Sequence, residues 1–103
     1  MIVHLVLLKI RRDVPPAEVA RVFEAVGALR KVIPGITDYA WGPYASPEGL
    51  NRGFTHGFSM TFESTAARDV YLPHPKHDAV KKEVLALLDG GLAGALAFDF
   101  ERT

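Results

Sequence analysis

The sequence of 103 residues has no cysteine, which excludes a disulfide framework, a thiolate nucleophile and a metal site built on sulfur ligands. It has no excess of either charge, because 12 Lys and Arg balance 12 Asp and Glu, and this balance argues against a nucleic-acid-binding protein. No stretch approaches the roughly 20 apolar residues of a membrane-spanning helix. The apolar start, Met1–Ile10, precedes the basic pair Arg11–Arg12, whereas a signal peptide carries its positive charge first. We therefore expect a cytoplasmic protein with neither nucleic acid nor a membrane as partner.

Length and composition indicate one globular domain, residues 1–103. The chain is 49% hydrophobic and 23% charged, as ordinary globular chains are and disordered or collagenous ones are not. A net charge of zero leaves little repulsion between copies, which is tolerable where apolar surface is hidden in an oligomer.

The order of hydrophobic patterns predicts the fold class. Apolar residues at every second position indicate strands, and apolar residues at spacings of three and four indicate helices. The predicted strands are Met1–Ile10, Ile36–Tyr44, Phe54–Glu63 and Leu92–Glu101, and the predicted helical segments are Pro15–Ile33, Ala66–Tyr71 and Asp78–Leu88. The resulting order, β-α-β-β-α-β, predicts an α+β ferredoxin-like fold with a four-stranded antiparallel sheet and helices on one face.

The first strand is apolar on both of its faces. One face carries Ile2, His4, Val6, Leu8 and Ile10, and the other carries Val3, Leu5, Leu7 and Lys9. The helices of so small a domain cover one face of its sheet, so the second face needs a partner. We therefore expect a homodimer that forms through this second sheet face.

Proline, glycine and serine mark the ends of the predicted helices. Pro15–Pro16 opens the first helix, since proline is tolerated in a first turn, and Pro34–Gly35 ends it. Ser64 is a candidate N-cap of the second segment. The stretch from Pro73 to His77 is predicted to break the helix, because a proline disfavours helical geometry in the residue before it.

Two histidines, His4 and His56, lie on the apolar faces of two strands that would be adjacent in this fold. An unpaired buried imidazole costs on the order of 1–3 kcal/mol, so each ring needs a partner or a cavity. One interpretation is a ligand pocket between sheet and helices, to which Phe58 on the face of His56 also contributes. The other is that each histidine is an ordinary core residue whose hydrogen bonds are satisfied.

Tyr71 and His77 flank the proline-rich break. In a functional interpretation the break holds them close together, so that the phenol donates to a developing oxyanion while the imidazole accepts a proton. In a structural interpretation the segment is only a rigid turn, and His77 caps the helix that it opens.

A metal site is a further alternative, since His74 and His77 stand three residues apart and His4 and His56 supply two more nitrogen ligands. However, no acidic residue stands at the spacing of a His-Glu-x-x-His site. Gly90–Gly91 and Gly94 form no phosphate-binding loop or dinucleotide fingerprint. We therefore expect neither a metal nor a cofactor.

Several blocks of the sequence, in order, resemble one known family. The resembling blocks are Met1–Lys9, Ile33–Ile36, Ser46–Leu50, Gly53–His56, Thr61–Ser64 and Tyr71–His77. They are similar to the stress-responsive A/B barrel domain (Dabb) proteins over nearly the whole chain. The resemblance implies a ferredoxin-like domain that pairs into a dimeric α/β barrel, in agreement with the apolar second face of the first strand.

The resemblance also implies candidate site residues. A polyketide cyclase branch of the family uses a tyrosine and a histidine in an intramolecular aldol condensation, and the matching positions here are Tyr71 and His77, with His4 and His56 as cavity residues. The leading hypothesis is a homodimer that binds a small, largely apolar molecule, with acid–base chemistry by His77 and Tyr71. The alternatives are a cofactor-free cyclase or monooxygenase and a non-catalytic, stress-related oligomer.

Overall fold

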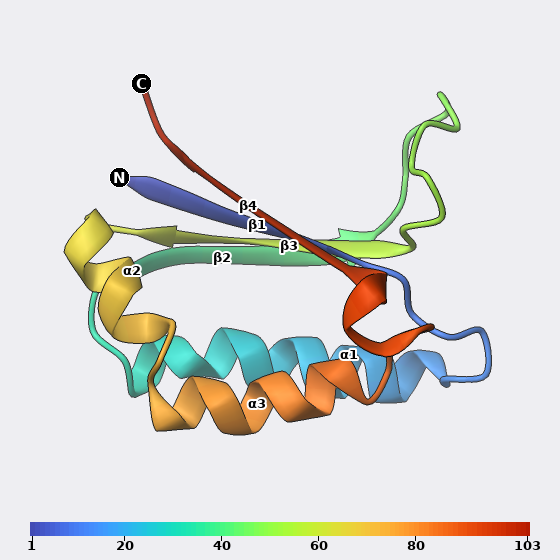
Figure 1. Ribbon diagram of the computed structural model, residues 1–103, viewed down its shortest axis with the longest axis horizontal. Helices are drawn as coiled ribbons and strands as arrows, with labels where there is room; N and C mark the ends of the chain where they lie inside the picture. The colour runs from blue at the N-terminus through green and yellow to red at the C-terminus, as the bar shows by residue number, and fades with distance from the viewer.

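The computed structural model describes residues 1–103 and shows one antiparallel sheet with helices on a single face (Figure 1). The elements are β1 (Ile2–Leu8), α1 (Pro16–Gly27), the 3-10 turn η1 (Ala28–Lys31), β2 (Ile36–Pro43), β3 (His56–Phe62), α2 (Thr65–Tyr71), α3 (Pro75–Leu85), the 3-10 turn η2 (Gly91–Gly94) and β4 (Ala95–Glu101). The strands lie in the order β2-β3-β1-β4. This order is that of the ferredoxin-like fold, so the predicted fold class is confirmed.

The central strand β1 carries the alternation on which the core depends. It pairs with β3 on one side and β4 on the other, and Val6 lies opposite both Phe58 and Ala97. Its even-numbered residues are buried beneath the helices, whereas its odd-numbered residues are only partly buried on the opposite face. Alternation with a period of two residues thus gives the sheet one face that the helices cover and one outer face.

The first helix packs on the sheet through a single apolar stripe. Val19, Val22, Phe23 and Val26 are buried, as their spacing predicts, and the stripe continues into η1. Gly27 ends α1 where the Tyr39 ring crosses it: a Cβ there would lie 2.8 Å from a ring carbon of Tyr39. The Tyr39 hydroxyl also donates to the Phe23 carbonyl at 2.7 Å, which ties β2 to the helix.

The later helices begin at two different caps. Ser64 accepts a hydrogen bond from the Ala67 amide at 3.1 Å and caps α2, as predicted. The prediction for α3 was wrong: the helix begins at Pro75 rather than Asp78, and its cap is His74, whose Nδ1 accepts from the Lys76 amide at 3.0 Å. Pro75 occupies the first helical turn, where its missing N–H costs nothing, so this second proline starts a helix instead of breaking one.

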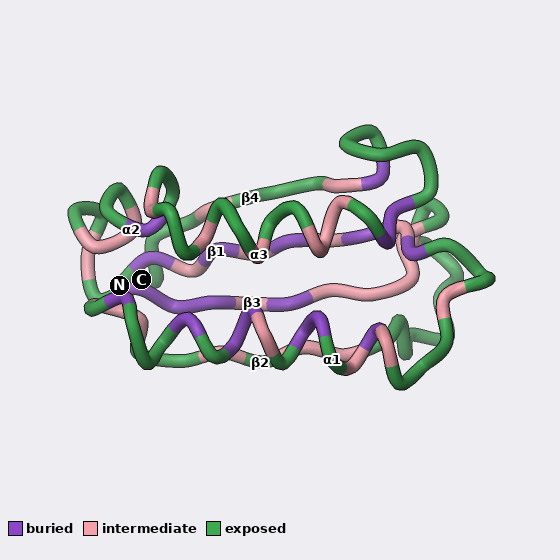
Figure 2. Tube along the Cα trace, turned by 90° about the horizontal axis from the view of Figure 1, so that it is seen from below, coloured by how far each residue is buried: buried purple, intermediate pink, exposed green.

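The edge strand β4 has large apolar side chains on the outer sheet face. Leu96, Phe98 and Phe100 are exposed, and Phe98 reaches 58%. Figure 2, seen from the helix side, shows that β4 is mostly exposed while β1 and β3 are mostly buried. The loop between β2 and β3 also rises on the outer side (Figure 1). None of the helices is long and apolar enough to cross a membrane.

Candidate functional site

A cavity of about 250 Å³ lies between the sheet and α3. Thirteen of its 16 lining residues are hydrophobic, and most of them come from β1, β3, β4 and the three helices. The other three are His4, His77 and Lys81. A concave apolar site with a few polar groups has the character of a small-molecule site, although it is smaller than the usual range of about 300–1,000 Å³.

The cavity exists because two opposing elements leave space between them. Ala95 and Ala97 are the β4 residues that line it, and both side chains are small. Opposite them, α3 has no buried residue. Val80 and Val84 of α3 face the cavity and are only partly buried. Small side chains on the strand and a helix that does not pack closely on it therefore leave the hollow unfilled.

Tyr71 and His77 meet at one end of this cavity. Tyr71 is the last residue of α2, and His77 lies in the first turn of α3, so the short turn through Pro73 brings the two rings together. Their ring centroids are 4.1 Å apart and their planes differ by 26°, which is a stacked pair. The proximity predicted from the proline-rich break is confirmed, whereas the cap role suggested for His77 belongs to His74.

The Tyr71 hydroxyl makes no hydrogen bond within the chain. The side chain is only 1% exposed, yet the hydroxyl has no hydrogen-bond partner in the chain. Every side-chain nitrogen or oxygen that is sealed from solvent does have a partner. The hydroxyl is therefore not sealed from solvent, and Tyr71 is one of the residues that line the cavity. Burial raises the pKa of this phenol above its ordinary value of 10.0, so it stays protonated near neutral pH and acts as a donor.

The environment of His77 leaves one ring nitrogen free. Its Nδ1 lies 2.9 Å from the Leu72 carbonyl oxygen, which can only accept, so Nδ1 carries the proton and Nε2 keeps its lone pair. Burial lowers the pKa of His77 below its ordinary value of 6.5, against the opposing effect of the Leu72 hydrogen bond, and the charge of Lys81 lowers it further. At neutral pH His77 is therefore an uncharged base.

His4 is held in place by a chain of charged groups. Its Nδ1 lies 2.5 Å from Asp99 Oδ1, and the second carboxylate oxygen of Asp99 lies 3.2 Å from Arg68. A carboxylate can only accept, so Nδ1 of His4 donates this hydrogen bond. Nε2, on the opposite side of the ring, takes no part in it. The His4 ring stands edge-on to Tyr71, at 6.2 Å between centroids, and edge-on to Phe58 at 6.1 Å. His4, Phe58, Tyr71 and His77 thus line one cavity.

His56 is not part of this group. It lies opposite Leu8 in the β1–β3 register, whereas His4 lies opposite Met60, so the two histidines are four positions apart along the pair. The His56 ring stacks on Phe23 and its Nδ1 contacts the Thr55 hydroxyl at 2.8 Å. Burial lowers the pKa of His56. The structure therefore places His56 outside the cavity that holds His4.

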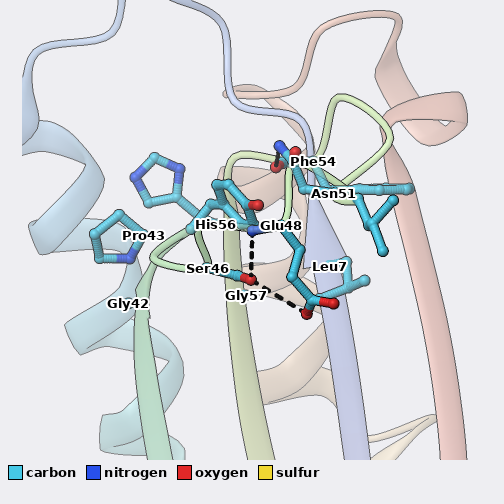
Figure 3. A pocket seen from close by; sticks show the side chains of 11 residues that line it. Leu7, Gly42, Pro43, Ser46, Glu48, Asn51, Phe54, His56 and Gly57 are labelled. Carbon is cyan, nitrogen blue, oxygen red and sulfur yellow. Dashed lines mark hydrogen bonds between the residues drawn. The ribbon is translucent and has the colours of Figure 1, made fainter.

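His56 instead borders a second hollow, of about 430 Å³, beneath the loop between β2 and β3. Figure 3 shows the His56 ring beside Pro43 on one side of this hollow and Leu7 and Phe54 on the other. Ser46 and Glu48 are hydrogen-bonded to each other within the loop. These two polar residues of the hollow therefore already have hydrogen-bond partners within the loop.

The four histidines do not assemble into the metal site considered from the sequence. No three or more His, Asp or Glu side chains lie close enough together to hold a metal ion. The ring nitrogen of His74 caps α3, and His56 lies at the second hollow.

Sequence reasoning missed two residues: Asp99, which contacts the cavity residue His4, and Lys81, which lines the cavity. Asp99 is an acidic residue among the apolar residues of the last strand, and that interruption is the signal that marks it. Lys81 lies four residues after His77, which places both on the same face of a helix.

Comparison with known proteins agrees with this architecture. A sequence profile of the family described as "Stress responsive A/B Barrel Domain" matches residues 2–102. A stress-response A/B barrel domain-containing protein, HS1 from Arabidopsis thaliana, is 30% identical over 100 residues, which are 97% of this chain and 88% of that protein. Olivetolic acid cyclase from Cannabis sativa is 31% identical over 74 residues, 72% of this chain and 73% of that enzyme.

A solved structure gives the same result for the fold. A dimeric ferredoxin-like protein of unknown function from Jannaschia sp. CCS1 superimposes with a TM-score of 0.81 at 30% identity. The alignment covers 98% of each chain.

Proposed function

The chain belongs to the stress-responsive A/B barrel domain family, and we propose that it binds a small, largely apolar molecule in the cavity beneath α3 and moves protons on it. The observation that carries this proposal is the Tyr71–His77 pair, stacked at 4.1 Å at the end of an apolar cavity. One partner presents a free base nitrogen and the other a free hydroxyl donor. General acid–base catalysis requires this combination.

The proposed step needs no group beyond the chain and a carbonyl compound. Nε2 of His77 accepts a proton from the carbon next to the carbonyl group, and the electron pair of the C–H bond moves to the carbonyl oxygen. The Tyr71 hydroxyl donates a hydrogen bond to the resulting enolate oxygen and stabilises its charge in the apolar cavity. The imidazolium then returns the proton to carbon, or to oxygen, and both residues regain their first state.

A cyclase activity is the second candidate function. It is favoured by the similarity to a protein named olivetolic acid cyclase, which covers 72% of this chain. An intramolecular aldol condensation begins with the same proton abstraction at a carbon next to a carbonyl. It differs in that the enolate carbon then attacks a second carbonyl of the same molecule. The volume of about 250 Å³ limits such a substrate to a short one.

Hydrogen–deuterium exchange at carbon tests the acid–base proposal directly. Phenylacetone in D₂O serves as the probe, and NMR follows the loss of its α-protons. We expect the protein to accelerate exchange, and His77→Ala to reduce the acceleration at least about 100-fold, as loss of a general base does. Tyr71→Phe should reduce it too while keeping the ring in the core.

The matched control is His74→Asn, which removes an imidazole three residues away but keeps a side chain that can cap α3. This variant should exchange like the unmodified protein. Exchange no faster than in buffer, or unchanged in His77→Ala, would overturn the catalytic part. If phenylacetone binds without exchange, the protein binds ligands but does not catalyse proton transfer. If phenylacetone does not bind at all, the result favours the non-catalytic oligomer.

The outer sheet face is the proposed homodimer interface. Its large side chains, Leu96, Phe98 and Phe100, are exposed to solvent in the single chain. Contiguous apolar surface of this kind marks an interaction site. The Jannaschia sp. CCS1 protein, which shares the fold, is described as dimeric. These two observations support a symmetric pair in which the outer faces cover each other.

A further inference from the structure

Lys81 is the one fully charged residue that lines the cavity, and no carboxylate lines it. The side chain belongs to α3, one turn after His77, and is exposed. Its ammonium therefore stands at the mouth, while the histidines and Tyr71 line the interior. A cavity with apolar walls and a cation at its rim has two chemically different ends.

The charge of Lys81 is not neutralised by a neighbour. None of the ion pairs in the chain includes it. The adjacent Lys82 faces Asp78 at 3.9 Å, and Glu83 binds Arg21. Asp99, the carboxylate next to the cavity, is shared by His4 and Arg68.

The environment of Lys81 favours an anion over a neutral group. The charge of Lys81 acts on a group inside the cavity, since it contributes to the lowered pKa of His77. Apolar walls screen a charge less than water does, so an ammonium at such a mouth attracts a negative group more strongly than one on an open surface.

We propose that Lys81 selects ligands that carry a carboxylate at one end of a short apolar body. This inference rests on the proposed function, since it concerns the ligand of the same cavity. The carboxylate lies at the mouth against the Lys81 ammonium, and the apolar body lies inside, with its far end near Tyr71 and His77.

A matched pair of probes tests this selectivity: 3-phenylpropanoate and its neutral amide, 3-phenylpropanamide, which have the same shape. Their dissociation constants are measured by NMR titration at low salt and again at high salt. We expect the unmodified protein to prefer the carboxylate about three- to tenfold at low salt, and the preference to shrink at high salt, as partly exposed charge pairs do.

Substitutions test whether the preference for the carboxylate depends on the charge of Lys81 itself. Lys81→Gln should abolish the preference for the carboxylate over the amide, and Lys81→Glu should reverse it. Lys82→Gln is the control, because it removes an adjacent charge that does not line the cavity. Glutamine is a good helix former, so α3 is retained.

The outcomes distinguish this inference from the function on which it rests. If the amide binds but the carboxylate is not preferred, or if Lys81→Gln keeps the preference, the selectivity proposal is overturned and the apolar binding site stands. If neither probe binds, both proposals fail.

Discussion

Replacing Asp99 by asparagine tests whether the His4–Asp99 contact stabilises the site. The substitution keeps the shape of the side chain but removes its charge. His4 Nδ1 then donates to an amide oxygen instead of a carboxylate, 2.5 Å away in the unmodified chain. The amide can also rotate and present its NH₂ group to the ring, which would favour the opposite tautomer of His4.

The size of the expected loss of stability follows from the burial of the His4–Asp99 pair. The His4 side chain is 9% exposed and that of Asp99 is 24% exposed, so solvent screens their contact only partly. A hydrogen bond to a charged group contributes about 1.5–3 kcal/mol, and a neutral one about 0.5–1.5 kcal/mol. Asp99→Asn should therefore lower the free energy of unfolding by about 1–2 kcal/mol. In a domain of this size this corresponds to a melting temperature lower by about 5–15 °C.

Urea and thermal unfolding followed by circular dichroism measure the effect, at one fixed protein concentration because dimerisation adds to apparent stability. Asp69→Asn is the matched control: Asp69 also pairs with Arg68, at 3.0 Å, but its side chain is 63% exposed. It should leave stability unchanged within error. If Asp99→Asn is as stable as Asp69→Asn, the contact with His4 contributes nothing and the reasoning is refuted.

Four further predictions concern the cavity, the outer face and one turn. Because the pKa of His77 is lowered from 6.5, deuterium exchange should fall with decreasing pH through a midpoint below 6.5; a midpoint at or above 6.5 would contradict this. Ala97→Leu should fill the cavity and abolish phenylacetone binding without loss of stability in urea, whereas retained binding would place the ligand elsewhere. Phe98→Asp should weaken dimerisation at least about 30-fold in sedimentation experiments, as loss of a central interface aromatic does, and an unchanged dimer would rule out this face. Gly35→Ala should cost roughly 1–3 kcal/mol in urea unfolding, because φ is +91° there and the new methyl would lie 2.5 Å from Ala67 Cβ; a neutral effect would show that the turn relaxes.

The elements that sequence reasoning located well are those whose pattern is set by burial. The α1 stripe and the alternation of β1 reflect contact with one core, so periodicity alone reveals them. The approach of Tyr71 to His77 was also predictable, because only five residues separate them and two prolines restrict the turn.

The features that were missed depend on register and on the context of single residues. His4 and His56 both face the helices, but only the antiparallel register shows that His56 lies opposite Leu8 and not opposite His4. Hydrophobic alternation is the same for every register that differs by two residues, so it contains no such information. Pro75 was misjudged for a similar reason, since proline both breaks helices and begins them.

The two faces of β4 connect the cavity with the outer sheet face. In most half-exposed strands the large apolar residues face the domain's own core, yet here the helix face carries Ala95 and Ala97, while the outer face carries Phe98 and Phe100. If the strand served only the stability of a single chain, this arrangement would be doubly unfavourable, because it leaves a hollow inside and apolar rings in water. Both disadvantages disappear if a second copy covers the rings and a ligand fills the hollow. The same strand therefore argues for both proposals, and Ala97→Leu and Phe98→Asp, one residue apart, test them independently.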